Sequence, residues 1–134
     1  MHFVGVDIFM LYFSSLLKTN DTYKSSADRL FAALNSQSIS YQLLDSTRDI
    51  WLRDFMPVKT KSGKYISFRY EPSYLKDDPN LRTDFRREIA SLLSLENLIY
   101  SDINLDGGNI VLSPSKGTAI ISDRIFTENS NYSP

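Results

Sequence analysis

One pattern constrains the fold of this chain more than any other: a helix, a short strand, a loop that ends in aspartate and a β-hairpin occur twice in succession. Asp54 and Asp106 take equivalent places, and a turn containing glycine follows each of them. Self-similarity with a period of roughly 50 residues is typical of propellers and repeat arrays. We therefore predict an α/β fold built from two pseudo-repeated β-α-β modules, over about 1–72 and about 81–129, within one unit that spans residues 1–134.

Hydrophobic periodicity and turn residues predict the elements of the two modules. The first module is expected to contain a buried strand at residues 3–12, a helix at 22–35 that Asn20-Asp21 caps, and a second strand at 40–44. An acid-bearing loop at 45–54 and a hairpin at 57–70 should follow. The hairpin is expected to turn at Ser62-Gly63. A surface loop is expected at residues 71–80. The second module is then expected to contain a helix that starts at Thr83-Asp84 and covers residues 83–93, a strand at 98–100 and a hairpin at 109–122. The second helix should bury one apolar face, formed by Phe85, Ile89, Leu92 and Leu93.

Composition excludes several functional classes. The formal net charge is −1 and Arg86-Arg87 is the only basic pair, which argues against a nucleic-acid partner. The sequence has no cysteine, so this chain offers no disulfide, thiol nucleophile or thiolate metal site. The apolar stretch at residues 3–17 follows no positive charge, is interrupted by Asp7 and is too short to span a bilayer. We expect a cytoplasmic protein without a membrane partner.

The two acid-bearing loops have the composition of a site for a planar cation. A guanidinium presents its N–H donors in one plane, and a carboxylate accepts two of them side by side. Asp54 is the first candidate, Asp106 could hold the opposite edge, and Trp51 could stack over the bound cation. Gly107 and Gly108 would let the backbone approach a ligand closely, with an amide contact from the adjoining Asn109.

Structural roles for the same residues remain open. Arg53 and Asp54 could form an ordinary surface ion pair, and Asp49 could cap the turn or pair with Arg53. The glycine pair could serve only a tight bend, and it lacks the Lys-Ser/Thr of a phosphate loop. The only histidine, His2, has no ligand-type neighbour, so we predict no metal site and no cofactor.

Two ordered blocks, Asp49-Ile50-Trp51-Leu52-Arg53-Asp54 and Leu105-Asp106-Gly107-Gly108-Asn109, resemble the agmatine deiminase and Porphyromonas-type peptidylarginine deiminase family of the guanidino-group-modifying pentein superfamily. The resemblance covers essentially the whole chain but only about two of the family's five modules, and so implies a partial pentein α/β propeller. It also implies a cofactor-free hydrolysis of a guanidine to a ureido group and ammonia, with a cysteine thiolate as nucleophile and a histidine as acid and base. Asp54 would bind the guanidinium, Trp51 would pack against it, and Asp106 would take the acidic position before Gly-Gly.

The chain also departs from that family. Met56 replaces a glycine that many members carry before proline, and the Gly-His-x-Asp segment and the late cysteine have no counterpart. We therefore expect a member of an enzyme family that is inactive as this chain, acts on agmatine, arginine or peptidyl-arginine in putrescine or arginine metabolism, and associates with a C-terminal portion or a second copy. The alternatives are a non-catalytic guanidinium-binding or assembly module and, less favoured, a glycosidase with Asp54 and Asp106 as acid and base.

Overall fold

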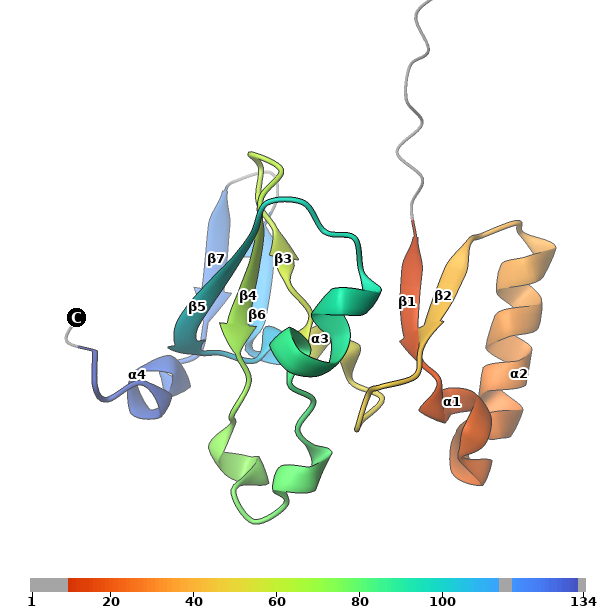
Figure 1. Cartoon of the computed structure of the whole chain (residues 1–134), viewed down its shortest axis with the longest axis horizontal. Helices are drawn as coiled ribbons and strands as arrows, with labels where there is room; N and C mark the ends of the chain where they lie inside the picture. The colour runs from red at the N-terminus through yellow and green to blue at the C-terminus, as the bar shows by residue number, and fades with distance from the viewer. Residues whose placement is uncertain (1–9, 114–116, 133–134) are drawn as a thin grey trace, which may run out of the picture.

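The computed structural model describes residues 10–113 and 117–132, and within them it shows a mixed α/β fold with three small sheets (Figure 1). Strands β1 and β2 form a parallel pair, β3, β4 and β5 form a mixed sheet, and β6 and β7 form an antiparallel pair. The α/β class is as predicted. No closed barrel or propeller is present in the described ranges, so the propeller stays an expectation drawn from the resemblance.

The N-terminal layer is the parallel pair β1 (Leu11–Ser14) and β2 (Tyr41–Leu44), connected through α1 (Leu16–Thr19) and α2 (Asp21–Ser36). Helix α2 begins where predicted, because the Asn20 side chain accepts a hydrogen bond from the Thr22 amide at 3.0 Å. The second strand is confirmed. Most of the strand expected at 3–12 lies outside the described residues, and the described strand is β1.

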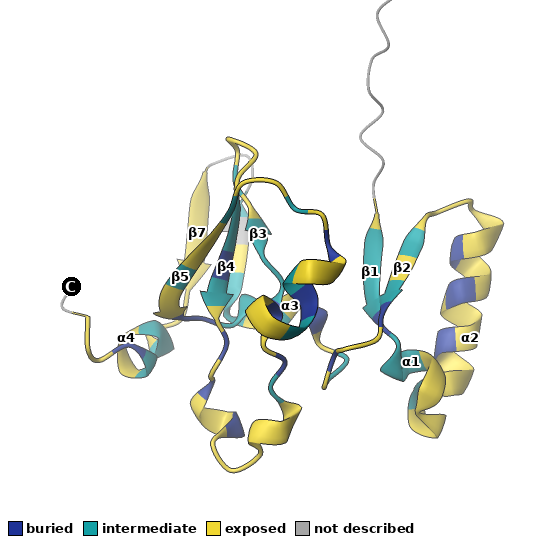
Figure 2. Ribbon diagram, in the orientation of Figure 1, coloured by how far each residue is buried: buried dark blue, intermediate teal, exposed yellow. Residues whose placement is uncertain are grey.

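Helix α2 packs on this sheet through one apolar face. Its buried residues are Ala27, Phe31 and Leu34, which recur at helical spacing. Phe31 stacks on Tyr41 with ring centroids 4.8 Å apart and meets Phe13 edge-on at 5.5 Å. The other face of the helix is exposed, as Figure 2 shows.

The central sheet contains the hairpin of β3 (Val58–Lys59) and β4 (Tyr65–Arg69), and β5 (Leu98–Asn104) runs parallel to β4. The predicted turn is confirmed, since Gly63 adopts φ +82°. Strand β5 continues four residues beyond the predicted 98–100. Because β5 hydrogen-bonds to β4, the central sheet contains strands from both predicted modules.

The connection from β4 to β5 differs from the predicted loop and helix. It contains the 3₁₀ turns η1 (Ser73–Leu75) and η2 (Pro79–Leu81), the π-helical turn η3 (Phe85–Ile89) and the 3₁₀ turn η4 (Ala90–Leu92). The predicted start is correct, because the Asp84 side chain accepts the Arg87 amide. The predicted apolar face is wrong at one residue. The change from π to 3₁₀ geometry alters the spacing of side chains around the axis, so Leu92 is 48% exposed.

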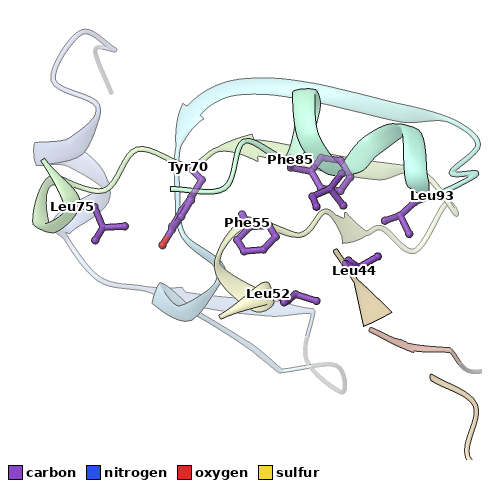
Figure 3. Packing of buried hydrophobic residues seen from close by; sticks show 8 residues of the cluster. Leu44, Leu52, Phe55, Tyr70, Leu75, Phe85 and Leu93 are labelled. Carbon is purple, nitrogen blue, oxygen red and sulfur yellow. The ribbon is translucent and has the colours of Figure 1, made fainter. Parts of the chain in front are cut away.

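The main core lies between this connection, the central sheet and the short helix α3 (Leu52–Phe55) (Figure 3). Helix α3 falls inside the predicted loop at 45–54 and ends just beyond it. It forms because Leu52 and Phe55 both enter the core, which consists of Leu44, Leu52, Phe55, Tyr70, Leu75, Phe85, Ile89 and Leu93.

The chain then forms the predicted hairpin of β6 (Ile110–Ser113) and β7 (Thr118–Ile121), followed by α4 (Arg124–Glu128). Residues 114–116 of its predicted turn lie outside the described residues. Every residue of β7 is exposed (Figure 2). None of the helices in the described ranges is both long enough and apolar enough to cross a bilayer.

Candidate functional site

The side chain of Arg53 joins the two acid-bearing segments. Its Nε donates to the Gly107 carbonyl oxygen at 3.0 Å, and its terminal nitrogen donates to the Ile110 carbonyl oxygen at 2.8 Å. The guanidinium therefore fastens α3 to the 3₁₀ turn η5 (Gly107–Asn109), more than 50 residues later in the chain. Asp49 does not receive these donors and instead accepts the amide of its neighbour Ile50 at 2.6 Å.

The two glycines allow this close approach. A Cβ atom on Gly107 would lie 2.0 Å from the Arg53 carbonyl oxygen, and one on Gly108 would lie 2.7 Å from Asp54 Oδ1. Neither glycine has a positive φ, in contrast to Gly63 and Gly117. Glycine is therefore favoured at both positions because there is no room for a side chain, and not because of the backbone conformation. The sequence predicted a close backbone approach to a ligand, and the structure places the closest approach at α3.

The carboxylates of Asp54 and Asp106 meet beside Gly108. A Cβ atom on Gly108 would lie 2.7 Å from Asp54 Oδ1 and 3.5 Å from Asp106 Oδ1, so the two carboxylate oxygens are no farther apart than the sum of these distances. Both residues are half-buried. The structure thus brings together the two aspartates that sequence reasoning had paired.

Burial and neighbouring charge raise the pKa of Asp54. Loss of hydration is the largest cause, followed by the negative charge of Asp106 and, more weakly, that of Asp49. The Gly108 amide, which hydrogen-bonds to the carboxylate, and the Arg53 charge act in the opposite direction. A cation bound between the two carboxylates would offset the negative charge that disfavours ionisation of Asp54.

Trp51 and Asn109 belong to the two segments that carry the aspartates. Trp51 directly precedes α3, and its carbonyl oxygen accepts the Asp54 amide at 3.0 Å. Its indole is 63% exposed and so is not a core residue. The Asn109 amide donates to the Asp106 carbonyl oxygen at 3.2 Å, which closes the turn that carries the glycines.

Two tyrosines that sequence reasoning missed lie near the aspartates. The hydroxyls of Tyr70 and Tyr74 are 3.3 Å apart, and the Arg124 guanidinium lies 4.8 Å from the centre of the Tyr74 ring. Burial raises the pKa of both phenols, and the negative charge of Asp54 raises them further. Both hydroxyls therefore stay protonated at neutral pH. Their four-residue spacing at the end of a strand was the only signal in the sequence.

An amide network supports the segment that carries Asp106. The Asn104 amide donates to Asn129 Oδ1 at 2.7 Å, and Asn129 Nδ2 donates back to the Asn104 carbonyl at 2.8 Å. Asn104 Nδ2 donates to the Glu71 carbonyl at 2.7 Å and to Glu128 Oε2 at 3.0 Å. The end of β5 is thereby held against α4, two residues before Asp106.

Residues 14–133 match the family described as Porphyromonas-type peptidyl-arginine deiminase. No curated protein and no solved structure matches the chain. The family match includes both acid-bearing segments, the Arg53 clamp between them and the amide network. Since it extends over nearly all of the sequence, this chain belongs to the Porphyromonas-type peptidyl-arginine deiminase family.

Proposed function

We propose that this chain provides the guanidinium-binding part of a guanidine deiminase site. The observation that carries the proposal is the convergence of the Asp54 and Asp106 carboxylates on one point beside Gly108. The Arg53 guanidinium, the nearest internal cation in sequence, donates to backbone carbonyls and, among the described residues, forms no ion pair with either carboxylate. A planar external cation would satisfy both carboxylates at once, and the exposed indole of Trp51 could cover its face.

The reaction we propose for the complete site is hydrolysis of the guanidinium to a ureido group with release of ammonia. Asp54 and Asp106 would accept the in-plane N–H groups and fix the central carbon for attack, a positioning role. The attack itself needs a nucleophile and a base. The sequence has no cysteine and its single histidine is His2, so we expect binding without turnover by the isolated chain.

Two further aspects belong to the same proposal. The substrate is a guanidino compound such as agmatine, arginine or a peptidyl-arginine, since the aspartate pair recognises the group that they share. Association with a separate C-terminal portion that carries the cysteine and histidine would complete the site, and association with a second copy is the other form of assembly that we propose. The β6–β7 hairpin exposes apolar side chains, with Val111 61% and Ile120 65% exposed, which also favours an assembly role as the alternative function. A glycosidase receives no support from the family match.

Isothermal titration calorimetry with agmatine, arginine and N-acetyl-arginine amide tests the binding proposal. We expect saturable binding that weakens roughly tenfold or more in Asp54→Asn and in Asp106→Asn, because each change removes a charge-assisted contact. Asp28→Asn is the matched control, since Asp28 pairs with Lys24 on the exposed face of α2. Unchanged affinity in both site variants would contradict the proposal.

An ammonia and ureido-product assay tests the expected lack of turnover. The isolated chain should bind the guanidine and release no ammonia. Robust turnover that Asp54→Asn abolishes would show that a residue of this chain supplies the nucleophile. Binding that is retained in a folded chain without turnover, and without association in light scattering, would favour the non-catalytic binding module.

A further inference from the structure

A cavity lined by arginines lies between strands β4 and β5 and the connection that contains η2 and η3. It has a volume of about 530 Å³. None of Trp51, Asp54 and Asp106 lines it. Its wall contains five arginines, namely Arg48, Arg69, Arg82, Arg86 and Arg87. The sequence showed only Arg86-Arg87 as a basic pair, because Arg48 and Arg69 come from distant segments and Arg82 lies four residues before Arg86.

Ion pairs neutralise three of these arginines. Arg48 donates through Nε to Glu88 at 2.8 Å. Arg69 lies 3.6 Å from Glu71, and Arg87 lies 3.5 Å from Asp84. These three acids also line the cavity, so the paired groups cancel within the wall.

Two arginines of the wall keep an uncompensated charge. Among the residues that the structure describes, no carboxylate lies within ion-pair distance of Arg82 or Arg86. Asp102 is the remaining acid of the lining, and it is exposed. The wall therefore carries five guanidinium groups against four carboxylates, which leaves a net positive cavity in a chain whose net charge is negative.

The wall is also organised before any ligand binds. The Arg86 guanidinium lies 4.0 Å from the centre of the Tyr100 ring, which holds the cation at the cavity wall. Ser67, which is only 3% exposed, and Ser101 add hydroxyl groups to the lining. The backbone at the cavity is fixed too, because the Arg48 amide donates to Thr83 Oγ1 at 2.9 Å.

We propose that this arginine cavity binds a small ligand through a phosphoryl group. The planar N–H fork of arginine matches phosphate oxygens in geometry, and the serine hydroxyls supply further donors. The volume lies in the range of small-molecule sites, roughly 300–1,000 Å³. A nucleic acid is disfavoured, because the formal net charge of the chain is −1 and Arg86-Arg87 is its only basic pair. The inference does not depend on the proposed deiminase site.

Phosphorus NMR and calorimetry with inorganic phosphate and pyrophosphate, at low ionic strength, test this proposal. We expect saturable binding that weakens at least ~10-fold when Arg82→Gln and Arg86→Gln are combined. The matched control combines Lys24→Gln and Arg29→Gln, which removes two charges from the exposed α2 and should leave binding unchanged. Circular dichroism verifies that each variant is folded.

Three results would overturn the proposal. They are absence of saturable binding to the wild-type chain, wild-type affinity in the cavity variant, and an equal loss in the α2 control, which would mean attraction by general charge. A single Arg86→Lys variant keeps the experiment informative if the double variant fails to fold. It retains the charge but loses the planar fork, so weaker pyrophosphate binding is expected, and wild-type affinity would count against recognition by Arg86.

Discussion

Alanine substitutions at the two adjoining glycines of η5 should have different consequences, although the two residues are neighbours. In Gly107→Ala the added methyl would lie 2.0 Å from the Arg53 carbonyl oxygen, a rigid backbone atom of α3. Ordinary C···O contacts are roughly 3.3–3.6 Å, so α3 and η5 would have to separate by about 1.3 Å or more. In Gly108→Ala the nearest atom, at 2.7 Å, is Asp54 Oδ1, which side-chain rotation can move.

We therefore expect a large stability loss in Gly107→Ala and a binding loss in Gly108→Ala. Overpacking against backbone costs about 1–3 kcal/mol, and Gly107→Ala would also stretch both hydrogen bonds of the Arg53 clamp. With a urea m value of ~2 kcal/mol/M for a chain of this size, the unfolding midpoint should fall by roughly 0.5–1.5 M. Gly108→Ala should change the midpoint less and weaken agmatine binding about tenfold, because Asp54 is displaced from Asp106.

Gly63→Ala is the control for conformational strain. Gly63 has φ +82° and no heavy atom near a Cβ position, so its substitution costs about 1 kcal/mol of backbone strain and should leave agmatine binding unchanged. The reasoning would be refuted if Gly107→Ala unfolded at the wild-type urea concentration. It would also be refuted if Gly108→Ala bound agmatine with wild-type affinity.

Three further predictions follow from the same contacts. Arg53→Lys keeps the charge but lacks the planar fork through which two nitrogens donate to Gly107 and Ile110. Calorimetry should therefore show agmatine affinity several-fold lower than in the wild type, and equal affinity would argue against the role of Arg53 in joining the two segments. Burial and the Asp106 charge raise the pKa of Asp54, so agmatine affinity should rise with pH through that pKa. The raised pKa stabilises the folded chain at low pH, and this contribution is lost as pH rises through the pKa of Asp54. Asp54→Asn should therefore make agmatine affinity less dependent on pH and should be more stable relative to the wild type toward neutral pH. Differences between the two proteins that do not change with pH would contradict this. Ile89→Ala empties a fully buried position and should cost about 2–5 kcal/mol in urea unfolding, whereas a loss under 1 kcal/mol would place Ile89 outside the core.

Local signals in the sequence predicted the elements whose causes are local. The start of α2 depends on the Asn20 side chain and an amide two residues later, and the β3–β4 turn depends on one glycine. Hydrophobic periodicity and turn residues predicted β2 and both hairpins. These features need no knowledge of the rest of the chain, and the structure confirms them.

Other features depend on distant partners and could not be predicted. Helix α3 has only four residues and forms because Leu52 and Phe55 enter a core completed by later segments. Arg53 looked like an ion-pair partner of its neighbours, but its hydrogen-bond acceptors are carbonyls of another loop. Tyr74 approaches the aspartates because the segment after β4 is held against α4, where the Ser73 amide donates to Glu128 Oε1 at 2.9 Å. The pairing of Asp54 with Asp106 was predictable because the repeat gave them equivalent places.

The β1–β2 ribbon lies between two separate hydrophobic clusters. Leu11 and Phe13 pack with the α2 cluster, whereas Tyr12 and Leu44 pack with the main core. Because only the two-stranded β1–β2 sheet connects the α2 cluster to the main core, the N-terminal layer can open as a separate cooperative unit. Amide hydrogens in α2 should therefore exchange with solvent through a sub-global opening, at a lower free energy than those of the β4–β5 ladder. Fluctuation of the N-terminal layer would then leave the paired aspartates in place.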